Sequence, residues 1–467
     1  MKTLISGGTV VNSTGPIAAD VLVEDEIIIA VTTSGSSLSV SWGEGADRVI
    51  DATGLLVLPG GIDGHTHMEM PFGGTQSADT FETGTRAAAF GGTTTIIDFA
   101  IQSKGSTLRE GFERWSSKAQ GNCFIDYGFH MIMSDVTDSS LKEMDALVSE
   151  GISSFKLFMA YPGVFYSTDG DILRAMQQAA SNGAMIMMHA ENGIAIDVLV
   201  AQALARGESD PRYHGATRPA VLEAEATHRA IQLARVTNSP LYIVHLSATE
   251  ALGEVVTARD KGQNVFAETC PQYLFLAEDE MARPGFEGAK FVCSPPLRPE
   301  SYQRELWRGL RTDDLSIVST DHCPFCFKEQ KELGVGDFSK IPNGLPGVEH
   351  RMDLIYQGVN RGEISLARWV DVTSTAPARM FGLFPKKGVL APGADADIVI
   401  YDPSDTRTIS AKEHHMNVDY SAYEGLPVTG QVKIVLSRGS IIVENGCFVG
   451  RPGAGRFLHR GLNAFLE

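Results

Sequence analysis

Residues 55–67 have the sequence Leu55-Leu56-Val57-Leu58-Pro59-Gly60-Gly61-Ile62-Asp63-Gly64-His65-Thr66-His67. The apolar first half is typical of a buried β-strand. If the extended conformation continues, His65 and His67 project from the same face, because side chains alternate along a strand. Two adjacent imidazoles make a poor core and a good pair of metal ligands. Taken alone, the pair could equally be two ordinary histidines, so its meaning depends on the rest of the chain.

Eight apolar runs rich in β-branched residues alternate with segments long enough for helices. The runs are residues 56–62, 94–99, 125–131, 152–158, 184–188, 241–245, 265–269 and 315–320. Helical periodicity is clearest at residues 80–90, 172–182, 216–237 and 248–261. Eight strand-then-helix units predict an α/β fold, a (β/α)8 barrel of the TIM type. Continuous apolar strands, rather than alternating ones, favour a parallel sheet covered by helices.

Short strands lie on both sides of this region. They are residues 4–6, 21–23 and 27–31 before it, and residues 396–401, 432–436 and 440–443 after it. Their close spacing in the N-terminal flank predicts an antiparallel unit. Each flank is too small to bury a core alone, so we expect the two to pair into one small β-sandwich domain. The predicted domains are residues 1–56 (N-terminal part of the sandwich), 57–383 (catalytic barrel) and 384–467 (C-terminal part of the sandwich and a tail).

The composition limits the partners and the compartment. The chain has 467 residues and a net charge of −18, which argues against binding nucleic acid or anionic membranes. No apolar run approaches the roughly 18 residues of a membrane span, and the N-terminus lacks the features of a signal peptide. We therefore expect a soluble, cytoplasmic protein. The six cysteines are scattered, which favours free thiols, and the pair Cys323 and Cys326 is only a weak redox motif.

Residues that can bind a metal lie at the carboxyl ends of four further predicted strands. Lys156, His189, His245 and Asp321 follow residues 152–155, 185–188, 241–244 and 317–320. The carboxyl ends of barrel strands converge on one mouth, where active sites form. A histidine at a strand end is usually just a hydrogen-bonded polar group, and Asp321 could cap a helix. Lys156 is harder to dismiss, because lysine is rarely buried without a partner.

Together with His65 and His67, these residues predict a binuclear metal centre. Four imidazoles and one carboxylate suit two divalent ions, with zinc favoured. Two metals about 3.5–4 Å apart need a bridging ligand. A neutral lysine cannot bridge, but a lysine carboxylated by CO2 carries two oxygens and a negative charge. We therefore expect Lys156 to be an N6-carboxylysine.

Eight motifs, in order along the chain, carry a family resemblance. They occupy residues 61–67, 155–161, 188–193, 243–247, 268–274, 294–298, 321–325 and 343–347. With them the chain resembles the amidohydrolase superfamily, and within it the dihydropyrimidinase and D-hydantoinase group, over essentially its whole length. Gly64 is a small departure, since many members have proline there, and it leaves the expected ligands untouched.

The resemblance implies which side chains hold which metal ion. The more buried ion would be held by His65, His67 and Asp321, and the second ion by His189 and His245. Carboxylated Lys156 would bridge the two ions, together with a water or hydroxide.

For the substrate, the resemblance implies contacts with Tyr161, Ser294 and Asn343. The Tyr161 hydroxyl would reach into the mouth, and the backbones of Ser294 and Asn343 would hold the imide edge of a ring. The implied reaction is metal-dependent hydrolysis of the cyclic amide bond of 5,6-dihydropyrimidines (dihydrouracil and dihydrothymine, as in pyrimidine degradation), of 5-substituted hydantoins, or of both. The products would be N-carbamoyl amino acids. Members of the group are typically homotetramers, and we expect the same here.

A mechanism follows from these parts. The two metals lower the pKa of the bridging water, and the resulting hydroxide attacks the ring carbonyl. The second metal and the Tyr161 hydroxyl stabilise the negative charge that develops on the carbonyl oxygen. Asp321 takes the proton of the nucleophile and delivers it to the leaving nitrogen. Asp321 and Tyr161 are therefore the candidate catalytic residues.

Relatives with other functions share the barrel. A dihydroorotase would place an arginine just after the histidine pair to hold a carboxylate, but this chain has Met68 and Glu69 there. An allantoinase, which hydrolyses a cyclic ureide, is less easily excluded, although Tyr161, Ser294 and Asn343 fit the dihydropyrimidinase group better. Non-catalytic scaffold relatives have lost metal ligands, whereas this chain keeps all six positions.

Two groups of apolar residues leave alternatives open. Large side chains follow the first and fourth barrel strands: Met68, Met70, Pro71, Phe72, Phe158, Tyr161, Val164 and Phe165. They either pack the top of the barrel or form a hydrophobic pocket for a substituent on the substrate ring. Residues 451–467, with Phe457, Leu458 and Phe465, pack either on a neighbouring subunit or on their own β domain.

Overall fold

The computed structural model describes residues 1–466, and its centre is an eight-stranded parallel sheet. The strands in spatial order are β16 (Ile317–Val318), β15 (Val265–Thr269), β14 (Leu241–Ile243), β13 (Met185–His189), β12 (Ser154–Phe158), β11 (Asp126–Ile132), β10 (Thr93–Ile101) and β7 (Gly61–Thr66). A parallel bridge between Thr66 and His322 joins the two ends of the sheet, and the His67 N–H donates to the His322 carbonyl at 2.9 Å. The predicted (β/α)8 barrel is therefore confirmed.

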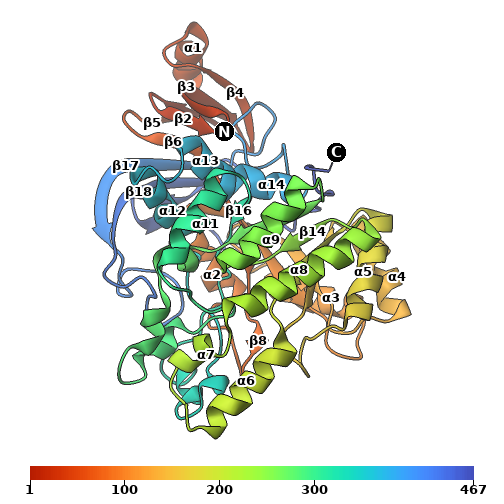
Figure 1. Cartoon of the computed structure of the whole chain (residues 1–467). Coiled ribbons are helices and arrows are strands. Elements are labelled where there is room, and N and C mark those ends of the chain that lie inside the picture. Colours follow the sequence, from red (N-terminus) through yellow and green to blue (C-terminus); the bar gives the residue numbers. More distant parts are fainter. Residues whose placement is uncertain (467) are drawn as a thin grey trace.

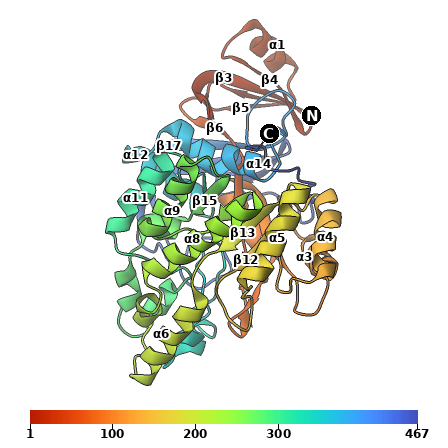
Figure 2. The same ribbon diagram turned by 45° about the vertical axis from the view of Figure 1, so that its right-hand side comes forward.

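Helices surround these strands (Figure 1). The longer ones are α2 (Phe81–Phe90), α3 (Leu108–Ala119), α4 (Asp138–Ser149), α5 (Asp169–Asn182), α6 (Gly193–Ala205), α8 (Ala220–Thr237), α9 (Thr249–Asp260), α11 (Ser301–Arg311) and α12 (Arg351–Asn360). Figures 1 and 2 both show α9, α8, α5 and α4 side by side on the outside of the barrel. Shorter elements are α7 (Arg212–Ala216), α10 (Pro271–Phe275), α13 (Leu366–Val370), α14 (Ala376–Met380), η1 (Glu278–Ala282), η2 (Glu287–Phe291), η3 (Lys331–Gly334), η4 (Phe338–Lys340) and η5 (Asp371–Thr375).

The local sequence fixes where four of these helices begin. Helices α2, α3, α4 and α5 each follow a threonine: Thr80, Thr107, Thr137 and Thr168. Each hydroxyl accepts a hydrogen bond, 3.1–3.2 Å long, from the N–H three residues later. The residue at that later position bonds back to the threonine N–H. Such a capping box satisfies N–H groups that the first helical turn leaves free.

A ten-stranded mixed sheet joins the two flanks of the chain. Its strands in spatial order are β20 (Cys447–Phe448), β19 (Ser440–Glu444), β18 (Pro427–Ser437), β17 (Ile398–Thr408), β6 (Leu56–Pro59), β2 (Thr9–Asn12), β3 (Gly15–Glu24), β1 (Lys2–Ser6) and β5 (Arg48–Asp51), with β4 (Ile27–Thr33) paired to β3. A separate apolar core contains residues of both flanks, including Ile5, Val21, Ile398 and Leu436. The predicted association of the flanks into one β domain is confirmed.

The N-terminal flank is not purely antiparallel, so that prediction was wrong in part. Strands β1 and β5 are parallel, and so are β2 and β6. Helix α1 (Ser37–Gly45) lies between β4 and β5. A parallel pair needs a crossover connection of this kind, which a spacing argument on short strands overlooks.

The first predicted strand, residues 56–62, is two strands. Strand β6 pairs with β2 and β17 in the mixed sheet, whereas β7 pairs with β10 in the barrel. The chain crosses over at Gly60, where a Cβ would lie 2.1 Å from the Thr94 hydroxyl oxygen. The domain boundaries at 56/57 and 383/384 stay a prediction, and we propose moving the first to Gly60. The last predicted strand, residues 315–320, is shorter than expected, at Ile317–Val318.

The C-terminal tail packs on the barrel of its own chain. The Leu458 N–H donates to the Tyr127 carbonyl at 2.8 Å, and Phe457 forms a parallel bridge with Tyr127. A guanidinium nitrogen of Arg460 donates to the Phe129 carbonyl at 2.6 Å and to the Ser154 hydroxyl at 2.9 Å. The tail also contacts the β domain, because the Arg456 guanidinium pairs with Glu26 at 2.6 Å. Within the chain the tail therefore packs on the amino-terminal end of the barrel as well as on the β domain that one alternative named.

The opposite end of the barrel carries the mouth. The hairpin of β8 (Pro71–Phe72) and β9 (Thr75–Gln76) and helix α6 follow the carboxyl ends of their barrel strands. Figures 1 and 2 show α6 at the end of the molecule remote from β3, β4 and β5. Among residues 1–466, no helix is long and apolar enough to cross a membrane.

Candidate metal centre

The six residues predicted to bind metal all lie at the mouth of the barrel and are buried. They are His65 in β7, His67 just after it, Lys156 in β12, His189 at the end of β13, His245 after β14 and Asp321 after β16. Barrel closure brings them together, because the carboxyl ends of parallel strands meet at one rim. The strands thus deliver side chains that are up to 256 positions apart in sequence, from His65 to Asp321.

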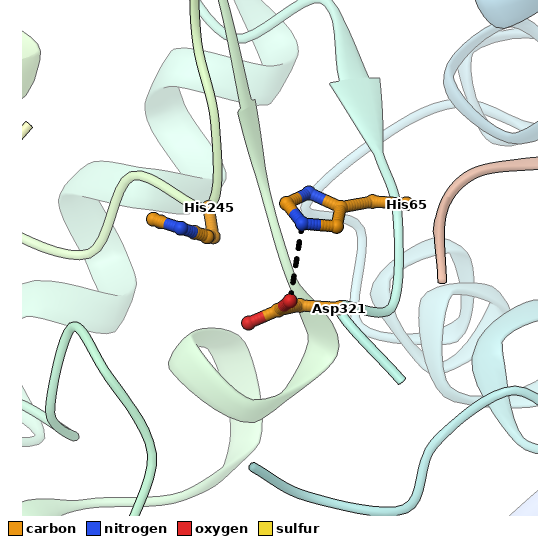
Figure 3. Close-up of side chains that lie close together, drawn as sticks. All are labelled: His65, His245 and Asp321. Carbon is orange, nitrogen blue, oxygen red and sulfur yellow. Dashed lines mark ion pairs between the residues drawn. The ribbon is translucent and has the colours of Figure 1, made fainter. Parts of the chain in front are cut away.

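Four of the six make one tight group. The Nε2 atoms of His65 and His67 lie 3.2 Å apart. The Asp321 Oδ1 atom lies 3.1 Å from the first and 3.2 Å from the second. The Lys156 Nζ atom lies 3.1 Å from His65 Nε2. Figure 3 shows His65 and Asp321 facing each other, with His245 on the other side of the same space.

The two remaining histidines form the second part of the group. The ring centroids of His189 and His245 are 4.6 Å apart, and those of His65 and His245 are 5.4 Å apart. Three possible ligand atoms lie within 4.8 Å of one another, one each from His65, His245 and Asp321. The structure therefore brings together every side chain that the sequence predicted as a ligand.

This donor set fits divalent cations. Ligands at about 2.0 Å from a tetrahedral zinc ion lie about 3.3 Å from one another, close to the spacing of His65, His67 and Asp321. The Nδ1 atom of His245 is buried and has no hydrogen-bond partner among the described residues. An unpaired buried imidazole nitrogen is costly unless something binds it. Imidazole and carboxylate donors are the ligands that zinc and similar ions take in proteins.

The cluster also shifts the pKa values of its own members. Burial alone would raise the pKa of Asp321, but His65 and His67 outweigh burial and hold it well below its ordinary value. Burial lowers the pKa of His67 to about 3 and that of Lys156 to about 8. The two ligand candidates His67 and Asp321 therefore lack protons at neutral pH, as metal binding requires.

Two carboxylates that orient these ligands were not predicted from the sequence. Glu268, in β15, contacts the Nδ1 atom of His65 and accepts from the His245 N–H at 3.2 Å. Glu191 lies 2.8 Å from the Nε2 atom of His189. A carboxylate on one imidazole nitrogen fixes the tautomer and leaves the other nitrogen free to bind a metal. Glu268 lies at the end of a predicted barrel strand, a position that could have identified it.

Two aspartates hold the His65 and His67 segment in place. Asp63 accepts from the Thr320 N–H at 3.1 Å and from its hydroxyl at 2.6 Å, which ties β7 to the chain before Asp321. Asp98 accepts from the Thr66 hydroxyl and from the Met68 N–H, each at 2.8 Å. The residues on both sides of His67 are thus anchored to one carboxylate.

Three site residues have a left-handed backbone. The φ angles are 59° at Tyr161, 40° at His245 and 50° at Asp321. Such angles are unfavourable for residues other than glycine, and they cluster at functional sites, where the surrounding structure enforces them.

The predicted substrate residues line a cavity beside the cluster. Tyr161, Ser294 and Asn343 border it together with His67, His189, His245, Lys156 and Asp321. The Asn343 amide donates to the Ser294 hydroxyl at 3.1 Å. Among residues 1–466, no backbone hydrogen bond uses the peptide N–H or carbonyl of Ser294 or Asn343. Four backbone groups of two residues that line the cavity therefore have no hydrogen-bond partner within the described chain.

Most of the predicted apolar pocket is present. Met70, Phe72, Phe158 and Phe165 line the inner cavity, and Pro71 and Val164 line a wider vestibule of about 960 Å³ that shares Phe72, Tyr161 and Asn343 with it. Met68 is the exception, because its side chain is buried against Gly84 of α2. Met68 packs the barrel wall, whereas the others surround open space.

The cysteines carry no disulfide in the described part of the chain. All six are free, and Cys323 is buried at the cavity wall while Cys326 is half-buried. The expectation of free thiols agrees with this arrangement.

Metal-dependent hydrolases built on this fold typically carry metal-binding side chains at the carboxyl ends of their barrel strands. The family model described as "Amidohydrolase family" matches residues 56–442. The chain belongs to the amidohydrolase family.

Relatives of known name match over the full length. A D-hydantoinase of Streptomyces coelicolor is 64% identical over 465 residues, which cover 100% of this chain and 99% of the relative. A D-hydantoinase of Geobacillus stearothermophilus is 51% identical over 462 residues, covering 98% and 97%. Among solved structures, a dihydropyrimidinase from Brevibacillus agri has a TM-score of 0.96 at 49% identity over 99% of both chains.

Proposed function

We propose that this protein hydrolyses the cyclic amide bond of 5-substituted hydantoins and 5,6-dihydropyrimidines to give N-carbamoyl amino acids. One observation carries the proposal: the His65, His67 and Asp321 cluster lies beside a cavity whose wall offers the free peptide groups of Ser294 and Asn343. Unpaired N–H and carbonyl groups suit an uncharged ring with an imide edge. The names of the two relatives favour the D enantiomers of 5-substituted hydantoins.

We propose that the cluster holds two divalent ions, with zinc favoured. The first ion would be held by His65, His67 and Asp321, and the second ion by His189 and His245. N6-carboxylated Lys156 would hold both ions. Bound there, such ions would supply a hydroxide nucleophile at neutral pH and polarise the ring carbonyl. Lys156 is suited to carboxylation, because its amine is buried and burial lowers its pKa to about 8, which makes the neutral, nucleophilic form accessible. The carboxylate formed on Nζ would offset the charge of the ions.

The chain's own residues would then move protons and hold the ring. Asp321 would take the proton of the nucleophile and deliver it to the leaving ring nitrogen. Desolvation raises the pKa of Tyr161, so its hydroxyl stays protonated and can donate to the developing oxyanion. The peptide groups of Ser294 and Asn343 would bind the imide edge of the ring.

A hydrolysis panel on one metal-analysed sample tests the function. We expect ring opening of D-5-phenylhydantoin, hydantoin and dihydrouracil, little or none of dihydroorotate, and loss of all activity after chelation. A clear preference for allantoin would favour an allantoinase instead. A preparation grown with zinc that contains no metal and opens no ring would favour the non-catalytic scaffold.

The same sample tests the carboxylation of Lys156. Zinc added back to the chelated protein is expected to restore activity slowly in CO2-free buffer and quickly with bicarbonate, because the bridging carboxylate must form first. Equal recovery in both buffers would count against N6-carboxylysine.

Phe165 offers a test of the pocket. Its ring is 7% exposed and stacks on Phe158 at 5.0 Å between centroids. Phe165→Ala is expected to lower kcat/KM for 5-phenylhydantoin about 10-fold more than for hydantoin, because one lost apolar wall discriminates by about that much. Phe465→Ala, on a ring that is 39% exposed and outside the cavity, serves as the control. Equal losses for both substrates would leave Phe165 as a packing residue only.

We further propose a cytoplasmic homotetramer. Exposed apolar side chains on α6 and α8 support an interface there, since Ile194, Val198 and Val221 are 52%, 53% and 62% exposed. Light scattering of the full chain measures the assembly, and a monomer at micromolar concentration would contradict it.

A further inference from the structure

A buried lysine outside the metal cluster binds three backbone carbonyls. Lys331 begins η3 and is 0% exposed. Its Nζ atom donates to the carbonyls of Val292, Pro342 and Gly344 at 3.0, 2.6 and 2.9 Å. An ammonium group has three N–H bonds, and these three acceptors use all of them.

The three carbonyls belong to the two segments that carry Ser294 and Asn343. Pro342 and Gly344 flank Asn343 on both sides, and Val292 lies two residues before Ser294. The Gly344 N–H also donates to the Val292 carbonyl at 3.0 Å. Lys331 therefore clamps together the two segments whose peptide groups line the cavity.

Packing alone is a poor explanation for this lysine. Its Nζ atom forms no ion pair in the part of the chain that the structure describes, and burial lowers the pKa of the amine to about 7. Backbone carbonyls alone therefore stabilise the charged form. Charges are seldom buried without an opposite charge, because their hydration is lost. A methionine would fill the same space without that cost.

One of the three bonds acts directly on a free peptide group. The Pro342 carbonyl and the Asn343 N–H belong to the same peptide unit. A hydrogen bond to a peptide carbonyl polarises that unit and makes its N–H a stronger donor. The shortest of the Lys331 contacts, 2.6 Å, is the one to Pro342.

We propose that Lys331 is a positioning residue that fixes the spacing of the Ser294 and Asn343 peptide groups and strengthens the Asn343 N–H as a donor to the substrate ring. This inference rests on the proposed function. The Asn343 N–H would bind the imide carbonyl that is not attacked, so this contact is made in the ground state as well as in the transition state. Loss of such contacts raises KM and leaves kcat nearly unchanged.

Lys331→Met tests the inference, with Lys328→Met as the matched control because Lys328 is exposed and three residues away. Lys331→Met is expected to raise KM for hydantoin and dihydrouracil roughly 10- to 100-fold, as loss of a charge-assisted bond does. The kcat is expected to stay within about 3-fold and the metal content to be unchanged. The control should match the starting protein in all three.

Two results would overturn the inference: an unchanged KM, or a parallel loss of kcat and metal, which a merely structural role predicts. If Lys331→Met does not fold, Lys331→Gln, which keeps a donor group, is judged by the same criteria. If the wild-type protein opens no ring in the panel, the proposed function is wrong. If the wild-type protein is active and the Lys331 variant has an unchanged KM, only the inference about Lys331 is wrong.

Discussion

Replacing Asp321 by asparagine is expected to lower kcat by roughly 10²- to 10⁴-fold, the usual contribution of a positioned general acid–base group. The carboxylate lies 3.1 Å from His65 Nε2 and 3.2 Å from His67 Nε2. Its pKa is held well below the ordinary value by those histidines, so it is ionised and able to accept a proton at neutral pH. Asparagine keeps an oxygen that can bind metal but cannot take the proton.

The measurement is kcat on D-5-phenylhydantoin, with metal content determined on the same sample. Asp279→Asn is a suitable control, because Asp279 is exposed and lies outside the cavity. The variant is expected to retain part of its metal. Near-wild-type turnover would remove Asp321 from proton transfer, and complete loss of metal would show that the residue acts as a ligand alone.

Replacing Lys387 by methionine is expected to lower the free energy of unfolding by about 3–5 kcal/mol, the cost of leaving the buried carboxylates of Asp395 and Asp397 unpaired. Asp126 would keep its ion pair with Arg438 at 3.1 Å. Lys387 is buried, and its Nζ atom lies 2.8 Å from Asp126, 3.1 Å from Asp395 and 2.6 Å from Asp397. The three carboxylates could by themselves hold a cation, and the lysine ammonium already fills that role. Asp126 lies in the barrel and Asp397 just before β17, so the network joins the two parts of the fold.

Unfolding in urea, or the rate of unfolding if the transition is irreversible, measures the effect. Lys386→Met is the matched control, since Lys386 is the exposed neighbour. Adding Asp397→Asn to Lys387→Met should recover part of the loss, because one unpaired carboxylate is removed. An unchanged midpoint for Lys387→Met would mean that water or relaxation solvates the carboxylates.

The barrel was predictable because each strand is a local apolar run and each helix a local periodic segment. The candidate metal cluster was predictable for the same reason. His189 follows one such run, His245 ends another and Lys156 lies in the second half of a third, and the carboxyl ends of the strands share one rim. The assignment of roles to these residues stays a proposal, although their convergence was correctly anticipated.

Contacts between distant segments were not predictable. Glu268 acts through His65, 203 residues away, and nothing near Glu268 indicates that partner. The crossing at Gly60 depends on its close approach to Thr94, which no apolar pattern reports. Met68 is as apolar as Met70 and Phe72, so the sequence did not distinguish it from them. Its N–H donates to Asp98, and its side chain packs against α2 instead of facing the cavity.

The tail gives the chain a late step in its biosynthesis. Arg460 bonds to Phe129 and Ser154 across 331 and 306 residues. Because a ribosome delivers the polypeptide from its N-terminus, β11 and β12 emerge long before this arginine does. The tail can therefore close the amino-terminal end of the barrel only after Arg460 has been synthesised, more than 300 residues after β11 and β12.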